Sequence, residues 1–199
     1  MITLGPIESF FKLPTEAPSD QGDGVLYHLR RDLEKLYGKE NDYTVDASEH
    51  AMLAMMGILA GIDYLSKVYS SKKHSREKFT DTLQNLCGFH VDAEAIYQLR
   101  CALVHSVSLS TVSVCSYRRG IKFIFEITDK AGAPLLAKLS DDGKEVAYKI
   151  NFLELKGSLI KVIDTLRTIC GDNSHPKHTH VINQVGQLHS EKIIKKHNA

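Results

Sequence analysis

The stretch AMLAMMGILAGI, residues 51–62, is apolar on nearly every side of a helix. A helix without a polar face is buried all round, so this stretch predicts the central helix of a helical bundle. Asp46 and Glu49 precede it in the spacing of an N-terminal cap with its reciprocal acid, and the helix is expected to run to about Ser70. Small residues recur along it and would let neighbouring helices approach closely. These residues are Ala54, Gly57, Ala60 and Gly61.

Further helices are expected on both sides of this stretch, because large apolar residues recur at helical spacing there. Glycines follow these segments where a left-handed C-terminal cap belongs, and Asn151 with Glu154 repeats the N-terminal capping pattern. The expected helices are 23–37, a third helix through Phe79 that ends at Gly88, 92–106 and 151–171. Residues 1–20 are expected to be irregular apart from a turn at 7–13. From residue 172 the chain is a polar, histidine-rich tail, with a terminal helix expected over 185–196.

The pattern changes after residue 106, where apolar and polar residues begin to alternate. Alternation over 121–127 and 146–150 predicts β-strands, and Asp141-Asp142-Gly143 predicts a turn between strands. We therefore expect an antiparallel sheet of three or four short strands within about 107–150. One face of this sheet is expected to pack on the helices through Phe123, Phe125 and Ile127.

The composition indicates a single soluble domain over residues 21–171. The chain has 199 residues, of which 43% are hydrophobic and 25% charged. A net charge of +1 argues against a strongly basic nucleic-acid binder, although it leaves room for a local basic patch. The four cysteines are widely spaced, which indicates reduced thiols of a cytosolic protein. There is no signal-peptide pattern, and the run 51–62 is too short to span a bilayer, so we predict a cytoplasmic protein without a membrane partner.

One short sequence pattern contains two side chains of catalytic type. In the segment 95–106, Arg100 and His105 are separated by four residues of core character. An ideal helix places them about 140° apart around the axis, with a rise of about 7.5 Å. An imidazole exchanges protons near neutral pH, and a guanidinium matches the oxygens of a phosphate. The two groups together suit cleavage of a phosphodiester.

An R-x-x-x-x-H pattern at the end of an amphipathic helix resembles the signature of the HEPN family of small helical proteins. The resemblance covers about residues 23–106 and 151–170, and it implies a mainly α, HEPN-like bundle into which the β segment is inserted. It further implies a metal-independent endoribonuclease of a toxin–antitoxin or defence system, without a cofactor. In the family, two protomers bring their motifs together, so Arg100 and His105 would act across a homodimer. RNA and an antitoxin protein are the expected partners.

Three residues are candidates for supporting roles around this motif. Asp63, at the end of the central apolar run, is a candidate partner that orients Arg100, unless it is a solvated acid. Tyr97 precedes Arg100 by one turn, where it could brace the guanidinium or contribute to packing. Cys101 follows Arg100 directly, at a position where HEPN nucleases usually have a polar residue.

Other interpretations of the motif and of the chain stay open. His105 could serve only to complement the helix dipole, and Arg100 could bridge a surface carboxylate. The chain would then be a non-catalytic HEPN-like interaction or nucleotide-binding module. A metal site in the tail is a weaker prediction, and so is an RNA-facing basic surface. The residues of the metal site would be Cys170, His175, His178 and His180. The residues of the basic surface would be Arg30, Arg31, Lys72, Lys73, Arg76, Arg118 and Arg119.

Overall fold

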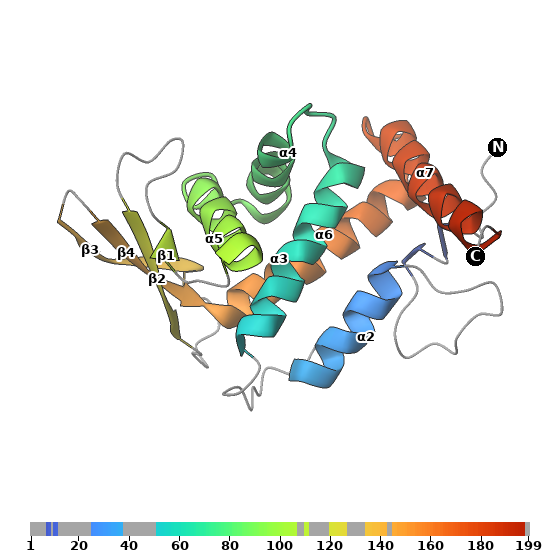
Figure 1. Cartoon of the computed structure of the whole chain (residues 1–199). Coiled ribbons are helices and arrows are strands. Elements are labelled where there is room, and N and C mark those ends of the chain that lie inside the picture. Colours follow the sequence, from blue (N-terminus) through green and yellow to red (C-terminus); the bar gives the residue numbers. More distant parts are fainter. Residues whose placement is uncertain are drawn as a thin grey trace.

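The fold is described from a computed structural model of the chain. The structure describes residues 7–8, 10–11, 25–37, 51–106, 110–111, 120–126, 134–142 and 145–197. Helices make up most of these residues, and a small sheet stands at one end of the molecule (Figure 1). The fold is therefore mainly helical with a β segment, as the sequence predicts.

The central helix is α3 (Ala51–Tyr69), which crosses the middle of the molecule (Figure 1). It contacts α2 (Val25–Tyr37) and all four of the helices α4 to α7. Its glycines make the close approaches that the sequence predicts: a Cβ at Gly57 would lie 3.1 Å from Leu33, and one at Gly61 would lie 2.7 Å from Leu29. The prediction of a buried central helix is confirmed.

The same helix bears on the question of a membrane. Of the described residues, only the window Met52–Tyr69 is long and apolar enough to cross a bilayer. The helix ends at Tyr69, as the sequence predicts, and the apolar window extends beyond the run 51–62 on which the expectation about a bilayer was based. More than half of the window is buried inside the fold, as in the core helix of a soluble protein.

The third predicted helix has a change of winding within it. It begins as α4 (Ser75–Thr82) and continues as a π-helical turn, η1 (Leu83–Cys87). Gly88 then ends it with a φ of 80°, a left-handed conformation that glycine adopts at little cost. Next comes α5 (Ala93–Ser106), in which the first-turn N–H of Ile96 donates to the carbonyl of Asp92 at 2.9 Å. Both helices lie where the sequence predicts them.

The sheet differs from its prediction in the direction of one pair of strands. Its strands are β1 (Ser110–Thr111), β2 (Gly120–Glu126), β3 (Leu136–Asp141) and β4 (Glu145–Asn151), in the spatial order β1-β2-β4-β3. β3 and β4 form the expected antiparallel pair, but β2 and β4 are parallel. The prediction of an entirely antiparallel sheet is wrong, because alternation shows which face of a strand is buried and carries no information about its direction.

One face of the sheet is buried, as expected. Ile121 and Phe123 of β2 are buried, whereas Lys122 between them is exposed. Phe123 stacks on Tyr148 of β4 with ring centroids 6.3 Å apart. The side chain of Phe125 and the whole of Ile127 lie outside the described residues, so their predicted packing is not tested.

The two C-terminal helices complete the core. Asn151 caps α6 (Phe152–Gly171), and its side-chain oxygen accepts hydrogen bonds from the N–H groups of Leu153 at 3.1 Å and Glu154 at 3.4 Å. The terminal helix α7 (His178–His197) begins before the predicted start at residue 185. It is not merely a polar tail, because Val181 and Val185 are fully buried in the common core.

The cysteines that the structure describes are free thiols, as predicted. Burial raises the pKa of Cys87 to about 11 and that of Cys170 to about 11, which keeps both protonated at neutral pH. Cys101 is half-buried. Cys115 lies outside the described residues.

Candidate functional site

Arg100 of α5 forms an ion pair with Asp63 of α3. Its Nη2 donates to the Oδ2 of Asp63 at 3.1 Å, and the exposed fractions of the two side chains are 18% and 12%. The contact that the sequence predicts between these residues is therefore present. Asp63 is not a solvated acid, because it sits between α3 and α5 rather than beyond the buried segment.

This ion pair leaves polar atoms unused. The second carboxylate oxygen of Asp63, Oδ1, is buried and has no hydrogen-bond partner. The Nε of Arg100 is also buried and without a partner. A bidentate pair would have satisfied more of these atoms, since a guanidinium and a carboxylate can form two parallel hydrogen bonds. The single contact holds the guanidinium and engages only one of its nitrogen atoms, Nη2, with the carboxylate.

Tyr97 and Cys101 border the same guanidinium. The Nη1 of Arg100 lies 4.0 Å from the Sγ of Cys101, at the limit for a weak hydrogen bond to sulfur. Burial raises the pKa of Tyr97, and a hydrogen bond with Cys101 raises it further. The ring of Tyr97 also packs edge-on against Phe79, with centroids 5.7 Å apart. The packing interpretation of Tyr97 is therefore confirmed, and its bracing of the guanidinium stays a prediction.

The charge of Arg100 is secured by its surroundings. Burial alone would lower the pKa of Arg100, but the Asp63 carboxylate and the Cys101 sulfur raise it above its ordinary value. A guanidinium in this position is always protonated. The group is therefore a permanent cation that is partly shielded from water.

For His105, the second residue of the motif, the structure describes the backbone position only. His105 is the penultimate residue of α5, in the last turn of the helix, as the sequence predicts. Its side chain lies outside the described part of the structure. The structure thus brings together Asp63, Tyr97, Arg100 and Cys101, and the relation of the imidazole to them stays a prediction.

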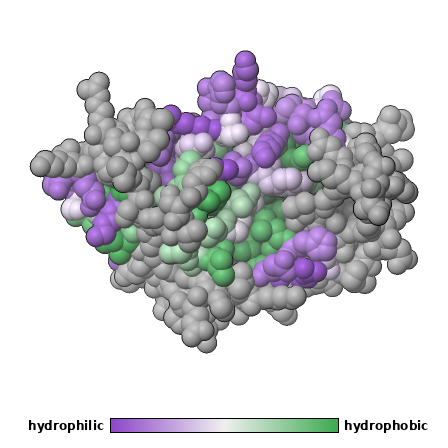
Figure 2. Space-filling view, in the orientation of Figure 1, coloured by the Kyte–Doolittle hydropathy of each residue, from purple (hydrophilic) through white to green (hydrophobic). Residues whose placement is uncertain are grey.

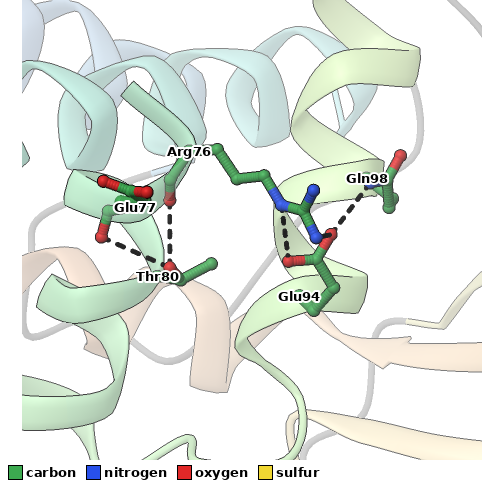
Figure 3. A network of polar contacts seen from close by, with 5 residues as sticks. All are labelled: Arg76, Glu77, Thr80, Glu94 and Gln98. Atoms are coloured by element: carbon green, nitrogen blue, oxygen red, sulfur yellow. Dashed lines mark hydrogen bonds and ion pairs between the residues drawn. The ribbon is translucent and has the colours of Figure 1, made fainter. Parts of the chain in front are cut away.

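A polar network anchors the start of α5 on α4 (Figure 3). Arg76 approaches Glu94 at two points, with Nε–Oε2 at 3.0 Å and Nη2–Oε1 at 2.8 Å. The buried Gln98 donates from Nε2 to Oε1 of Glu94 at 3.0 Å. Thr80 of α4 donates to the carbonyl of Arg76 at 3.0 Å, which fixes the turn that carries the arginine. The network orients the helix from which Arg100 projects.

Neither Glu94 nor Gln98 was predicted from the sequence as part of the site. The four-residue spacing of these two residues was the signal that could have paired them, since side chains at i and i+4 share a helix face. Nothing in the sequence pointed to their third partner, Arg76, because it belongs to another helix.

Apolar residues are exposed on both helices that carry the ion pair. Val104, one turn after Arg100 on α5, is 41% exposed. Leu53 of α3 is 58% exposed and lies about 15 Å from Asp63 along the helix axis. Figure 2 shows hydrophobic residues at the centre of this face, where α3 and α5 lie in Figure 1. Exposed apolar side chains on these two helices suit a surface that another chain covers.

The predicted basic surface is only partly present. Arg30 is buried, which excludes it from such a surface, and Arg31 pairs with its neighbour Asp32 at 2.9 Å. Arg76 belongs to the network just described. Lys72 and Lys73 are exposed. Arg118 and Arg119 lie outside the described residues.

The predicted metal site in the tail is not supported. In the part of the chain that the structure describes, no group of three histidine, cysteine, aspartate or glutamate residues lies together as a metal site needs.

Comparison with known proteins adds no relative. No protein-family model, no curated protein and no solved structure gives a significant match to the chain. The functional argument therefore rests on the residues themselves.

Proposed function

We propose that this chain is a HEPN-like, metal-independent endoribonuclease of a toxin–antitoxin or defence system, in which Arg100 and His105 cleave RNA across a homodimer. The supporting observation is the ion pair between Arg100 and Asp63. It holds a permanently charged guanidinium at a partly shielded surface of α5, five residues before the histidine. The proposed location is the cytoplasm.

The chemistry needs no metal. His105 takes the proton from a ribose 2′-hydroxyl, and the oxygen then attacks the adjacent phosphorus. As the new O2′–P bond forms, the bond from phosphorus to the 5′-oxygen breaks, and an imidazolium returns a proton to that oxygen. Arg100 stabilises the extra negative charge on the phosphoryl oxygens through those Nη donors that Asp63 does not engage. The products are a 2′,3′-cyclic phosphate and a 5′-hydroxyl.

A homodimer suits the surface around the ion pair. A second copy would cover the exposed Val104 and Leu53 and would remove more of the site from water. Electrostatic stabilisation by Arg100 is stronger in such a site, because the effective dielectric constant is lower. Light scattering at micromolar concentration should give the mass of a dimer, and a monomer would count against this proposal.

The decisive experiment is cleavage of labelled single-stranded RNA in excess chelator. His105→Ala should reduce the rate by about 10²–10⁴ through loss of proton transfer. Arg100→Lys should also be poorly active, because a point charge cannot reproduce the fork of a guanidinium. The exposed residues His90 and Arg167 provide matched controls, and His90→Ala and Arg167→Lys should retain full activity. A need for a divalent ion, or full activity in His105→Ala, would contradict the mechanism.

A second candidate function is a non-catalytic interaction module. It is favoured by the low exposure of Arg100, whose side chain is 18% exposed and already bound by Asp63. On this proposal Arg100 serves only to join α3 to α5. Wild-type protein that leaves RNA intact under all conditions, while forming a complex through the face that contains Val104, would favour it over the nuclease.

A further inference from the structure

Positive groups from separate segments meet at the C-terminal end of α3. Lys72 lies in the connection that follows α3, Lys78 lies in α4, and Lys177 directly precedes α7. The Nζ of Lys177 lies 3.5 Å from the ring centroid of Tyr69, near the end of α3. His180 follows in the first turn of α7. We call Lys72, Lys78 and Lys177 the cationic cluster, and His180 borders it.

The members of this cluster lie close enough to oppose one another's charge. Burial lowers the pKa of Lys177, and the charge of Lys72 lowers it further. Burial likewise lowers the pKa of His180, as do the charges of Lys177 and Lys78. The Nε2 atom of His180 is buried and has no hydrogen-bond partner. Positive charges that repel one another in this way destabilise the folded protein, and a bound anion relieves the repulsion.

Among the described residues, Asp81 is the acid whose charge favours that of Lys177. Asp81 raises the pKa of Lys177, but its Oδ2 accepts a hydrogen bond from Ser70 at 2.6 Å. Its Oδ1 accepts another from Asn85 at 2.9 Å. One carboxylate, engaged in this way, does not balance the positive charge of three lysines. The cluster therefore has unused capacity for an external anion.

We propose that the cationic cluster binds backbone phosphates of single-stranded RNA and leads the strand toward Arg100. This inference rests on the proposed function and names a second contact for the same substrate. Tyr69 and Asp63 belong to one helix and are six residues apart, which corresponds to a rise of about 9 Å. The two positions are close along the axis and about 120° apart around it, so a strand of a few nucleotides spans the distance from the end of α3 to the Arg100 site. Lysine ammonium groups bind phosphates without reading sequence, as a guiding surface requires.

The surroundings of the cluster favour RNA over a membrane surface. Membrane-surface helices combine cations with large exposed apolar residues that enter the lipid. Among the side chains that the structure describes, such residues are Leu53, Val91, Val104, Ile124 and Leu139. None belongs to the α3–α4 connection, to α4 or to residues 178–188 of α7, where that helix has described side chains. Figure 2 shows hydrophilic residues along the upper edge of the molecule, where this connection and the start of α7 lie in Figure 1.

The test measures binding of a labelled 2′-O-methyl RNA oligonucleotide, which keeps the phosphates but cannot be cleaved through its 2′-oxygens. The variant Lys72→Gln/Lys177→Gln should bind about tenfold more weakly than wild type near 0.1 M salt. The slope of log affinity against log salt should fall by about 1.4, for two lost contacts to a single strand. Lys72→Gln alone should show about half of that change in slope, and because Lys72 is exposed it should leave the fold intact.

Lys122→Gln provides the matched control, since Lys122 is exposed on β2 at the opposite end of the molecule (Figure 1). If both cluster variants bind RNA with the affinity and salt slope of this control, the inference is overturned. Binding to vesicles that contain anionic lipid, with none to RNA, also overturns it. Failure of the proposed function would give a different result. RNA that binds through the cluster but is never cleaved would support the binding surface and contradict the nuclease activity.

Discussion

The guanidinium of Arg100 meets the carboxylate of Asp63 at 3.1 Å, although the two residues are 37 positions apart in the chain. The contact joins α5 to the central helix α3 in a region where both side chains are mostly shielded from water. Removal of one partner would leave the other charge partly buried and unpaired, and such a loss is costly in proteins. The same contact fixes the position of the group that we assign to phosphate binding.

Replacement of Asp63 by asparagine should destabilise the protein by about 1–3 kcal/mol, because the Arg100 charge loses its counter-ion while the shape of the side chain is retained. Urea unfolding measures this change as a lower midpoint with an unchanged slope. Asp164→Asn on the exposed face of α6 is the control and should change stability by less than about 0.5 kcal/mol. Equal stability of the two variants would show that the ion pair does not support the fold.

The close packing of α3 predicts opposite effects for two glycines. A Cβ at Gly61 would lie 2.7 Å from Leu29 and 3.1 Å from Leu159, so Gly61→Ala should destabilise the protein by about 1–3 kcal/mol. Gly157 lies within α6 with nothing within 4 Å of its would-be Cβ. Gly157→Ala should therefore stabilise the protein by up to about 1 kcal/mol, through better helix propensity. Thermal unfolding of both variants tests the pair, and a stabilising Gly61→Ala would show that Leu29 moves aside freely.

Local sequence signals predicted most of the helical fold. The apolar run in α3, the glycine at residue 88 and the cap at Asn151 each act through neighbours a few residues away, so they are visible in the sequence. Asp63 was identified as a partner of Arg100 because a lone acid at the end of an apolar run is itself unusual. The parallel pairing of β2 with β4 was missed, since it depends on the path of the chain between them.

Features built from distant segments were harder to predict. The early start of α7 was missed because its buried face depends on only a few apolar residues, Val181 and Val185 among them, in a histidine-rich segment. The cationic cluster joins Lys72 and Lys177 through contacts that no spacing reveals. The sequence did single out Lys72 as basic surface, but it gave no reason to place the start of α7 beside it.

His180 should make stability depend on pH in the mildly acidic range. Its pKa in the folded protein is lowered from 6.5 by burial and by the charges of Lys177 and Lys78. The unfolded chain therefore binds a proton more readily. The stability due to neutral His180 is complete above pH 6.5 and is lost as the pH falls from 6.5 through the lower pKa of the folded state. His180→Gln should reduce the fall in melting temperature between pH 7.5 and 5.5. The exposed His90 is the control, and a fall of equal size in His180→Gln and His90→Ala would contradict the prediction.

Replacement of the whole ion pair separates its structural role from its chemical one. Arg100→Met and Asp63→Leu, made singly, should each destabilise the protein by about 1–3 kcal/mol because each leaves one shielded charge alone. The double variant should recover to within about 1 kcal/mol of wild type, since two apolar side chains replace both charges. If Arg100 acts on RNA, the double variant should nevertheless cleave no RNA. A stable double variant that cleaves RNA as fast as wild type would show that Arg100 serves the fold alone, and destabilisation equal to the sum of the singles would show that the two charges do not act as a pair.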